Sequence, residues 1–114
     1  MCARRLDEDI LELTLRETAI LSALAERPHD TLAISRECAA DANGELMGAG
    51  TLYPALKRLA RGGFIHQIPA EEARNPGKPR KVYALTAAGQ MVLEWQMARL
   101  EGMVSRARER LDAC

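Results

Sequence analysis

The chain has 114 residues, of which 47% are hydrophobic, and its formal net charge is zero. This length allows one core of ordinary size and leaves little room for a second domain. No apolar run approaches the ~20 residues of a membrane span, and acidic residues follow Leu6 where a signal peptide needs its apolar region. We therefore expect a single-domain cytoplasmic protein.

The three cysteines, Cys2, Cys38 and Cys114, lie far apart and form no C-x-x-C pair. This spacing argues against a disulfide framework and against a zinc site. We expect reduced thiols, with a redox switch through Cys2 or Cys114 as an open alternative.

The neutral total hides an uneven distribution of charge. Residues 1–50 carry a net charge of −5, residues 51–85 carry +5, and residues 86–114 carry zero. A local excess of positive charge is what binding to DNA phosphates requires, whatever the charge of the rest of the molecule. A solubility pattern without any partner would give the same distribution, so the charge alone does not decide.

Two helices are predicted in the first part of the chain. Between residues 16 and 26 apolar side chains recur at helical spacing, and Pro28 follows where a helix must already have ended. Thr31 can cap a second helix that runs to Ala40, and residues 41–44 have the composition of a turn. The apolar contacts of this second helix would come from Leu32, Ile34 and Cys38.

A third helix is predicted to open near Gly50 or Thr51, with Pro54 in its first turn, where a backbone donor would have no partner. Gly62 or Gly63 can take the left-handed conformation that ends a helix. The predicted buried stripe consists of Leu52, Ala55, Leu56 and Leu59. Five side chains on the flanks or outer face suit phosphates and base edges: Thr51, Tyr53, Lys57, Arg58 and Arg61.

After the glycines the pattern changes from helical to extended. Residues 64–68 and 82–85 are predicted strands, joined by a polar segment at residues 69–81. This hairpin carries four cations: Arg74, Lys78, Arg80 and Lys81. Three helices followed by a basic hairpin are typical of a winged helix-turn-helix, in which the third helix enters the major groove and the hairpin lies along the flanking backbone or minor groove.

The last segment has a heptad pattern. Alternating steps of four and three residues join Leu93, Met97, Leu100, Val104, Ala107 and Leu111. The pattern favours a seam with a second copy of the chain, although packing on the chain's own domain would give the same spacing. A homodimer would hold two recognition helices about 34 Å apart, the spacing of two half-sites on one duplex face.

The sequence thus predicts a mainly α fold with a small β-hairpin: a winged helix-turn-helix with a C-terminal dimerisation helix. Residues 1–14 would form a short helix that supports the dimer through Leu6, Ile10 and Leu13. Residues 15–85 would form the DNA-binding domain, and residues 86–114 the dimerisation helix.

Three large apolar side chains raise the question of a ligand. Met91, Trp95 and Met103 could line a pocket for a flat hydrophobic effector at a dimer interface. The same residues at helical spacing could equally be core packing.

Catalysis has almost no support in the sequence. His29 and His66 are separated by two predicted elements, and neither has a nearby nucleophile or acid in a recognisable arrangement. No Gly-rich phosphate loop or metal-ligand cluster is present. We expect a protein that is not an enzyme and needs no metal or other cofactor.

Four motifs resemble the PadR family of bacterial transcriptional regulators. They are residues 50–59 (GTLYPALKRL), 63–65 (GFI), 77–83 (GKPRKVY) and 85–89 (LTAAG), and the resemblance spans roughly residues 16–89. It implies a homodimeric winged-helix repressor of the small form, which binds an inverted repeat in a promoter and is often released by a small molecule. Where many members carry His-Gly-Tyr at the opening of the second helix, this chain has Asp30-Thr31-Leu32, and Thr31 and Arg36 are alternatives for the missing phosphate contact.

Two functions remain open at this point. In a sequence-specific DNA-binding repressor, Tyr53, Lys57 and the hairpin cations would hold phosphates while Thr51 and Arg58 reach base edges. In a protein-interaction module without specific DNA binding, the same fold would serve as a dimeric scaffold, and the acidic first half of the chain favours this alternative because negative charge opposes approach to DNA. The basic hairpin favours DNA binding.

Overall fold

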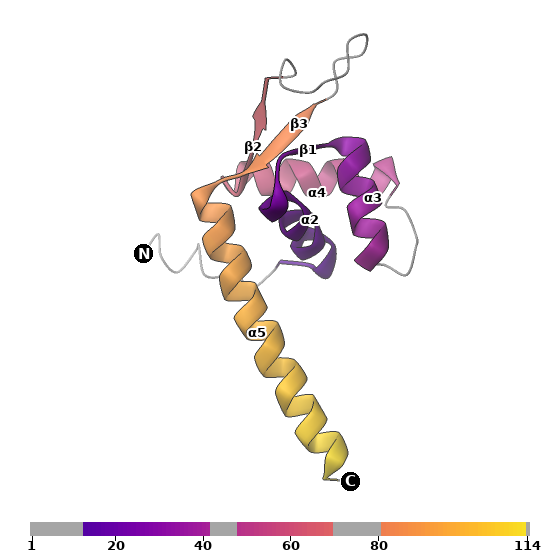
Figure 1. The fold of residues 1–114 in the computed structure, drawn as a ribbon, viewed down its shortest axis with the longest axis vertical. Helices are drawn as coiled ribbons and strands as arrows, with labels where there is room; N and C mark the ends of the chain where they lie inside the picture. Colours follow the sequence, from indigo (N-terminus) through magenta and orange to yellow (C-terminus); the bar gives the residue numbers. More distant parts are fainter. Residues whose placement is uncertain (1–12, 42–47, 70–80, 114) are drawn as a thin grey trace.

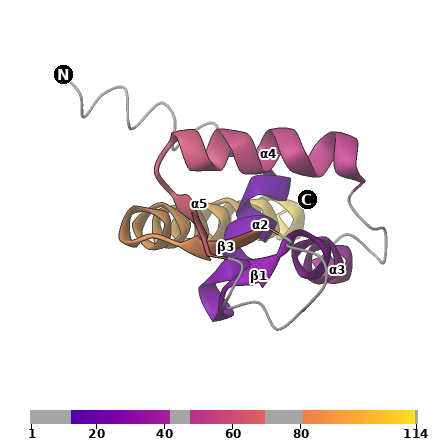
Figure 2. The same cartoon turned by 90° about the horizontal axis from the view of Figure 1, so that it is seen from above.

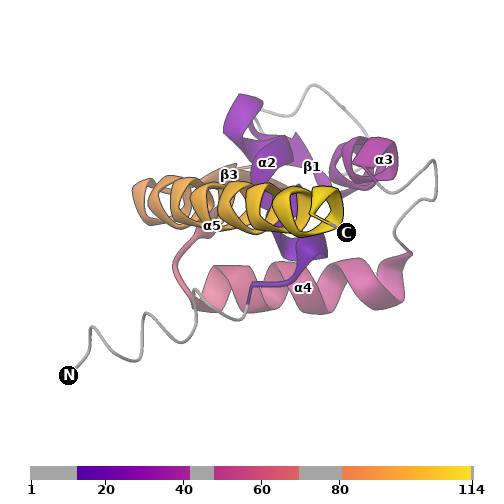
Figure 3. The same cartoon turned by 90° about the horizontal axis from the view of Figure 1, so that it is seen from below.

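The computed structural model describes residues 13–41, 48–69 and 81–113. Three helices and a small sheet form one globule, and a long last helix extends from it on its own (Figure 1). The elements in chain order are α2 (Leu15–Glu26), β1 (His29–Asp30), α3 (Thr31–Asp41), α4 (Ala49–Arg61), β2 (Ile65–Ile68), β3 (Val82–Leu85) and α5 (Ala87–Asp112). Seen from above and from below, α4 and α3 lie on opposite sides of α5 (Figures 2 and 3).

Helix α2 begins at a complete capping box. The Thr14 hydroxyl accepts a hydrogen bond from the Glu17 amide at 3.0 Å, and the Glu17 carboxylate accepts one from the Thr14 amide at 2.8 Å. Its buried apolar residues are Ile20, Leu21 and Leu24, and the helix packs against α3, α4 and α5. Helix α2 is therefore the centre of the globule.

Helix α3 begins one residue earlier than predicted, because its cap is different. The Asp30 carboxylate accepts a hydrogen bond from the Ala33 amide at 2.8 Å, so Asp30 caps the helix and Thr31 is already helical. Ile34 and Cys38 are buried as predicted, whereas Leu32 is exposed and the expected apolar contact is wrong. Most of the predicted turn, residues 42–44, lies outside the described residues.

Helix α4 begins at Ala49, earlier than predicted, after Gly48 at the cap. Pro54 therefore lies in the second turn and not in the first, and one internal hydrogen bond is missing there. The predicted buried stripe is confirmed: Leu52, Leu56 and Leu59 are buried, and Ala55 packs against the core.

The chain leaves α4 through a glycine turn. Gly62 stays near the helical region, while Gly63 has a φ of 78°, the left-handed conformation that glycine takes without strain. The Phe64 amide then bonds the Leu59 carbonyl at 3.0 Å. This turn aims the chain from α4 directly into β2.

The sheet is antiparallel with the order β1-β3-β2. In the predicted hairpin Ile65 pairs with Leu85 and Ile68 with Val82. Phe64, expected as part of the first strand, precedes it and is buried in the core. Strand β1 was not predicted, because two residues are too few to show a period.

Helix α5 changes character along its length. Its first half packs on α2 and the turn after α4, with Val92, Leu93 and Gln96 buried. Leu93, the first residue of the predicted dimer seam, is only 6% exposed and packs in the core of its own chain. Residues 103–112 are exposed all round the helix. No described helix is both long and apolar enough to cross a membrane.

Candidate nucleic-acid interface

Helix α4 runs along one edge of the globule, so one side of it faces solvent (Figure 2). With 3.6 residues per turn, Tyr53, Lys57 and Arg61 follow each other along one side of the helix, turned away from the stripe of Leu52, Leu56 and Leu59. All three are exposed. We call Tyr53, Lys57 and Arg61 the outer face of α4; it presents two cations and one phenol, groups that bind phosphates.

Thr51 and Arg58 do not belong to this outer face. They lie seven residues apart, two turns of the helix, on the other flank of α4, where Thr51 is half-buried and Arg58 is exposed. Arg58 Nε forms an ion pair with Glu17 Oε2 at 3.2 Å. The structure therefore divides the five residues predicted on this helix into an outer group of three and a flanking pair.

Glu17 is a buried acid that the sequence analysis did not single out. It is 3% exposed, and its two carboxylate oxygens contact two helices: Oε1 accepts a hydrogen bond from the Thr14 amide of the α2 cap, and Oε2 forms an ion pair with Arg58 of α4. The spacing Thr14-x-x-Glu17 is a capping-box pattern, so the cap could have been found in the sequence. The pairing with Arg58 depends on the fold.

Helix α5 approaches the same cap from another side. Gln96 Nε2, on a residue that is 4% exposed, donates to the Leu13 carbonyl at 3.4 Å and to Thr18 Oγ1 at 3.1 Å. Thr18 Oγ1 donates in turn to the Thr14 carbonyl at 2.8 Å. The start of α2 is thus held by polar contacts from both α4 and α5.

The hairpin lies next to the end of α4 and points away from the far end of α5 (Figure 1). Of the four predicted hairpin cations, Lys81 is described, and it is exposed immediately before β3. Arg74, Lys78 and Arg80 lie outside the described residues. Strand β2 adds exposed His66 and Gln67.

A cavity of about 210 Å³ lies at the carboxyl end of α4. It is lined by Leu13, Arg58, Leu59, Arg61, Gly62 and Phe64. None of the three residues predicted for an effector pocket lines this cavity.

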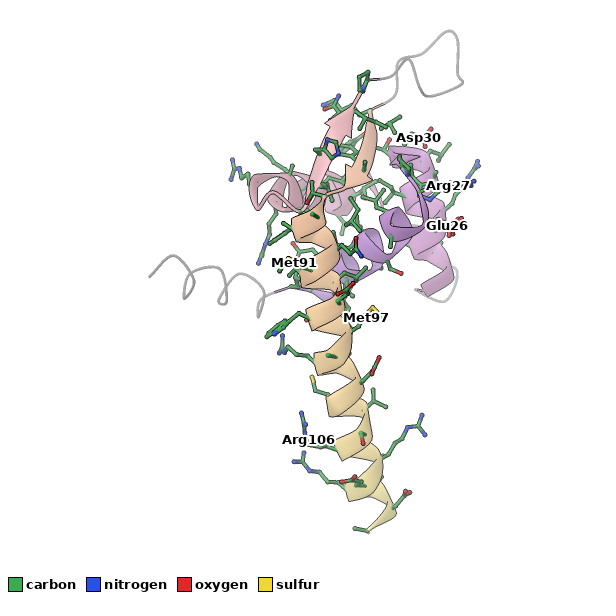
Figure 4. The ribbon with its side chains drawn as sticks, turned by 60° about the vertical axis from the view of Figure 1, so that its left-hand side comes forward. Glu26, Arg27, Asp30, Met91, Met97 and Arg106 are labelled. Carbon is green, nitrogen blue, oxygen red and sulfur yellow. The ribbon has the colours of Figure 1, made fainter. Side chains whose placement is uncertain are left out.

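Met91, Trp95 and Met103 are instead exposed on α5. Met91 and Met97 point to different sides of this helix, and Arg106 follows further along it (Figure 4). The Arg99 guanidinium carbon lies 4.9 Å from the centroid of the Trp95 ring, and Arg99 Nη1 donates to Gln96 Oε1 at 3.3 Å. Within one chain, Met91, Trp95 and Met103 therefore do not line a common pocket.

The remaining seam residues are on the same exposed helix. Met97, Val104 and Leu111 are exposed large apolar residues, Ala107 is exposed, and Leu100 is half-buried.

Among the described residues no group of His, Cys, Asp or Glu could hold a metal ion. Cys2 and Cys114 fall outside the described ranges, while Cys38 is buried in the core.

Three helices followed by an antiparallel hairpin, with the third helix on the surface, define a winged helix-turn-helix protein, as predicted. The model of the PadR-like transcriptional regulator family matches residues 20–95, about two thirds of the chain. The chain belongs to this family. It is accordingly a DNA-binding transcriptional regulator and not an enzyme.

Solved structures of the same family are similar in fold. A PadR family regulator from Eggerthella lenta is 26% identical, with 98% of this chain and 96% of that chain covered and a TM-score of 0.68. A PadR-like transcription factor from Bacteroides fragilis is 26% identical, with coverages of 83% and 88% and a TM-score of 0.69. A PadR family regulator from Clostridium difficile is 24% identical, with coverages of 86% and 99% and a TM-score of 0.72, and shows the fold alone. No curated protein matches the sequence.

Proposed function

We propose that this regulator is a homodimeric repressor that binds an inverted-repeat operator in duplex DNA. The observation that carries the proposal is the outer face of α4, where Tyr53, Lys57 and Arg61 are exposed on one side of the helix, away from the buried stripe. A surface helix with cations on its free side, followed by a hairpin, fits the major groove with its hairpin along the flanking backbone. Such a regulator would act on chromosomal DNA in the cytoplasm.

Within this proposal the residues have different roles. Tyr53, Lys57 and Arg61 bind phosphates and fix the register of α4, and Thr51, near the start of the helix, reaches a base edge. The hairpin cations Arg74, Lys78, Arg80 and Lys81 hold the flanking backbone. The ion pair of Arg58 with Glu17 supports a different role for Arg58: anchoring α4 to α2 rather than reading a base.

The exposed half of α5 supports the dimer in this proposal. Met97, Leu100, Val104, Ala107 and Leu111 continue a heptad spacing beyond the globule, where one chain offers them little cover. A second copy that packs on this stripe would remove apolar surface from water. Residues 1–14 would support the same interface, and a pocket for a hydrophobic effector would form from Met91, Trp95 and Met103 only when two copies meet.

A band-shift titration tests DNA binding. The protein is titrated against a DNA fragment from the promoter of its own gene, with a length-matched unrelated duplex as competitor. We expect a retarded complex that survives an excess of competitor, because specific complexes are typically ~10³-fold or more tighter than non-specific ones. Loss of the complex to equal amounts of competitor would contradict sequence-specific binding and favour a protein-interaction module.

A further inference from the structure

Glu17 combines features that rarely occur together at the start of a helix. It is an acid, it is 3% exposed, and it lies in the first turn of the central helix. Burial of a carboxylate is unfavourable unless its charge is paired and its oxygens accept hydrogen bonds. Both conditions are met here, by the Thr14 amide at 2.8 Å and by Arg58 Nε at 3.2 Å.

The cap alone does not require a charge at this position. A glutamine at the third position of a capping box accepts the same backbone hydrogen bond as a glutamate. The cation that pairs with the negative charge of Glu17 is Arg58, whose side chain is half exposed and so keeps part of its hydration. The carboxylate therefore serves α4 in addition to α2.

The ion pair between Arg58 and Glu17 can affect DNA binding because Arg58 lies close to the outer face of α4. Arg58 follows Lys57 directly and precedes Arg61 by three residues, so the two outer-face cations are within one turn of it. The buried contacts of Leu56 and Leu59 are apolar and constrain the rotation of α4 weakly, since hydrophobic contact has no direction. The ion pair of Arg58 Nε with Glu17 Oε2 at 3.2 Å joins one defined position of α4 to α2, so it constrains the direction of the outer face.

The partner of Arg58 is itself held firmly. Gln96 of α5 is 4% exposed and bonds Leu13 and Thr18 on either side of the cap. Thr18 bonds back to Thr14. The carboxylate of Glu17 thus projects from a turn that α5 braces, and α4 is fixed against the rest of the molecule through it.

We propose that Glu17 is a positioning residue for DNA binding: through Arg58 it sets the orientation of α4, so that Tyr53, Lys57 and Arg61 meet the phosphates together. This inference rests on the proposed DNA-binding function. The effect on DNA affinity that it predicts is opposite to the effect expected from charge alone, because removal of an acid from a DNA-binding protein ordinarily strengthens binding. Removal of the Glu17 carboxylate should weaken it.

A double-mutant cycle tests the proposal. Glu17→Gln keeps the capping hydrogen bond and removes the charge, Arg58→Gln removes the other partner, and the double variant removes both. Glu26→Gln, an exposed acid at the other end of the same helix, is the charge-matched control. Affinity for the promoter fragment and for an unrelated duplex is measured for each protein over a range of salt concentrations.

We expect each single variant to bind the promoter fragment roughly 5- to 30-fold more weakly, the factor that corresponds to about 1–2 kcal/mol. The double variant should bind no more weakly than either single variant, because both act through one contact. The salt slope should stay unchanged, since the cations that bind phosphates are all still present, and the ratio of specific to non-specific affinity should fall. Glu26→Gln should bind at least as tightly as the wild type.

Other outcomes overturn the inference. If Arg58 binds a phosphate itself, Arg58→Gln lowers the salt slope by about 0.9 and Glu17→Gln binds as tightly as the wild type or more so. A purely structural role for Glu17 would lower specific and non-specific affinity by the same factor. If Glu17→Gln does not fold, Arg58→Gln alone is read by the same criteria: weaker binding at an unchanged salt slope supports the inference, and a slope lowered by about 0.9 overturns it. A wild-type protein without affinity for either duplex would overturn the proposed function together with the inference.

Discussion

Among the described glycines, Gly89 is the one at which an added side chain would clash most severely. It lies in the first turn of α5, after the Thr86 cap, and an added Cβ would clash with the Phe64 carbonyl oxygen and with Leu85. The Thr86 hydroxyl also donates to the Gly63 carbonyl at 2.6 Å. These close backbone contacts hold the start of α5 against the turn that follows α4.

Gly89→Ala should therefore lower the free energy of unfolding by about 1–3 kcal/mol, the usual effect of overpacking. The control is Gly102→Ala on the same helix, where the new Cβ would meet only the flexible end of Arg106. This control should be neutral or stabilising by up to ~1 kcal/mol, because alanine favours helix. Chemical denaturation measures both, and an unchanged stability of Gly89→Ala would contradict the close approach.

Single residues also show which local contacts can be predicted from the sequence and which cannot. The Gly63 turn was predicted, because a glycine pair after an amphipathic helix indicates a left-handed end. Asp30 was overlooked as a cap because Thr31 beside it is also a preferred capping residue, and only the hydrogen bond to Ala33 decides between them. The role of Arg58 could not be predicted, because its partner Glu17 is 41 residues away in the sequence.

At the scale of elements, the helices and the hairpin were predictable and their ends less so. Periodicity placed α2, α3 and α4 to within two residues, since each buries a regular stripe. It misplaced Pro54 by a turn, because nothing in the sequence marks Ala49 as helical. Strand β1 forms only through its pairing with β3, a contact between distant segments.

Helix α5 shows that an interface, too, can be predicted only in part from the sequence. A heptad pattern identifies an apolar stripe without identifying what covers it. Its beginning, at Leu93, packs inside the chain, whereas Val104 and Leu111 stand clear of the globule. The proposed seam therefore begins later along the helix than the pattern alone indicates.

Val104→Asp tests this seam at a position that the chain's own core does not use. In a dimer the new carboxylate would be buried without a partner, so dissociation should be favoured, and the sedimentation mass should shift towards the monomer. Ser105→Asp, the same charge one residue further and outside the heptad pattern, should leave the mass unchanged. Equal masses for both variants would place the interface elsewhere.

For the whole molecule, the structure refines the meaning of the positive segment. Of the cations in residues 51–85, Lys57 and Arg61 lie on the outer face of α4, Arg58 pairs with Glu17, and Lys81 lies at the foot of the hairpin. The acidic first half is partly accounted for, since Glu17 is buried and Asp30 caps a helix. Among the described cations of this segment, Lys57 and Arg61 are thus the two that the outer face of α4 can present to DNA.

The salt dependence of DNA binding tests the central claim, that the outer face of α4 meets the phosphate backbone. The variant Lys57→Gln/Arg61→Gln is compared with Arg106→Gln/Arg108→Gln, which removes the same charge from the exposed part of α5. We predict that the slope of log affinity against log salt falls by about 1.8 for the α4 variant, roughly 0.9 for each phosphate that is no longer neutralised, and is unchanged for the α5 variant. Identical slopes for the two variants would contradict the claim.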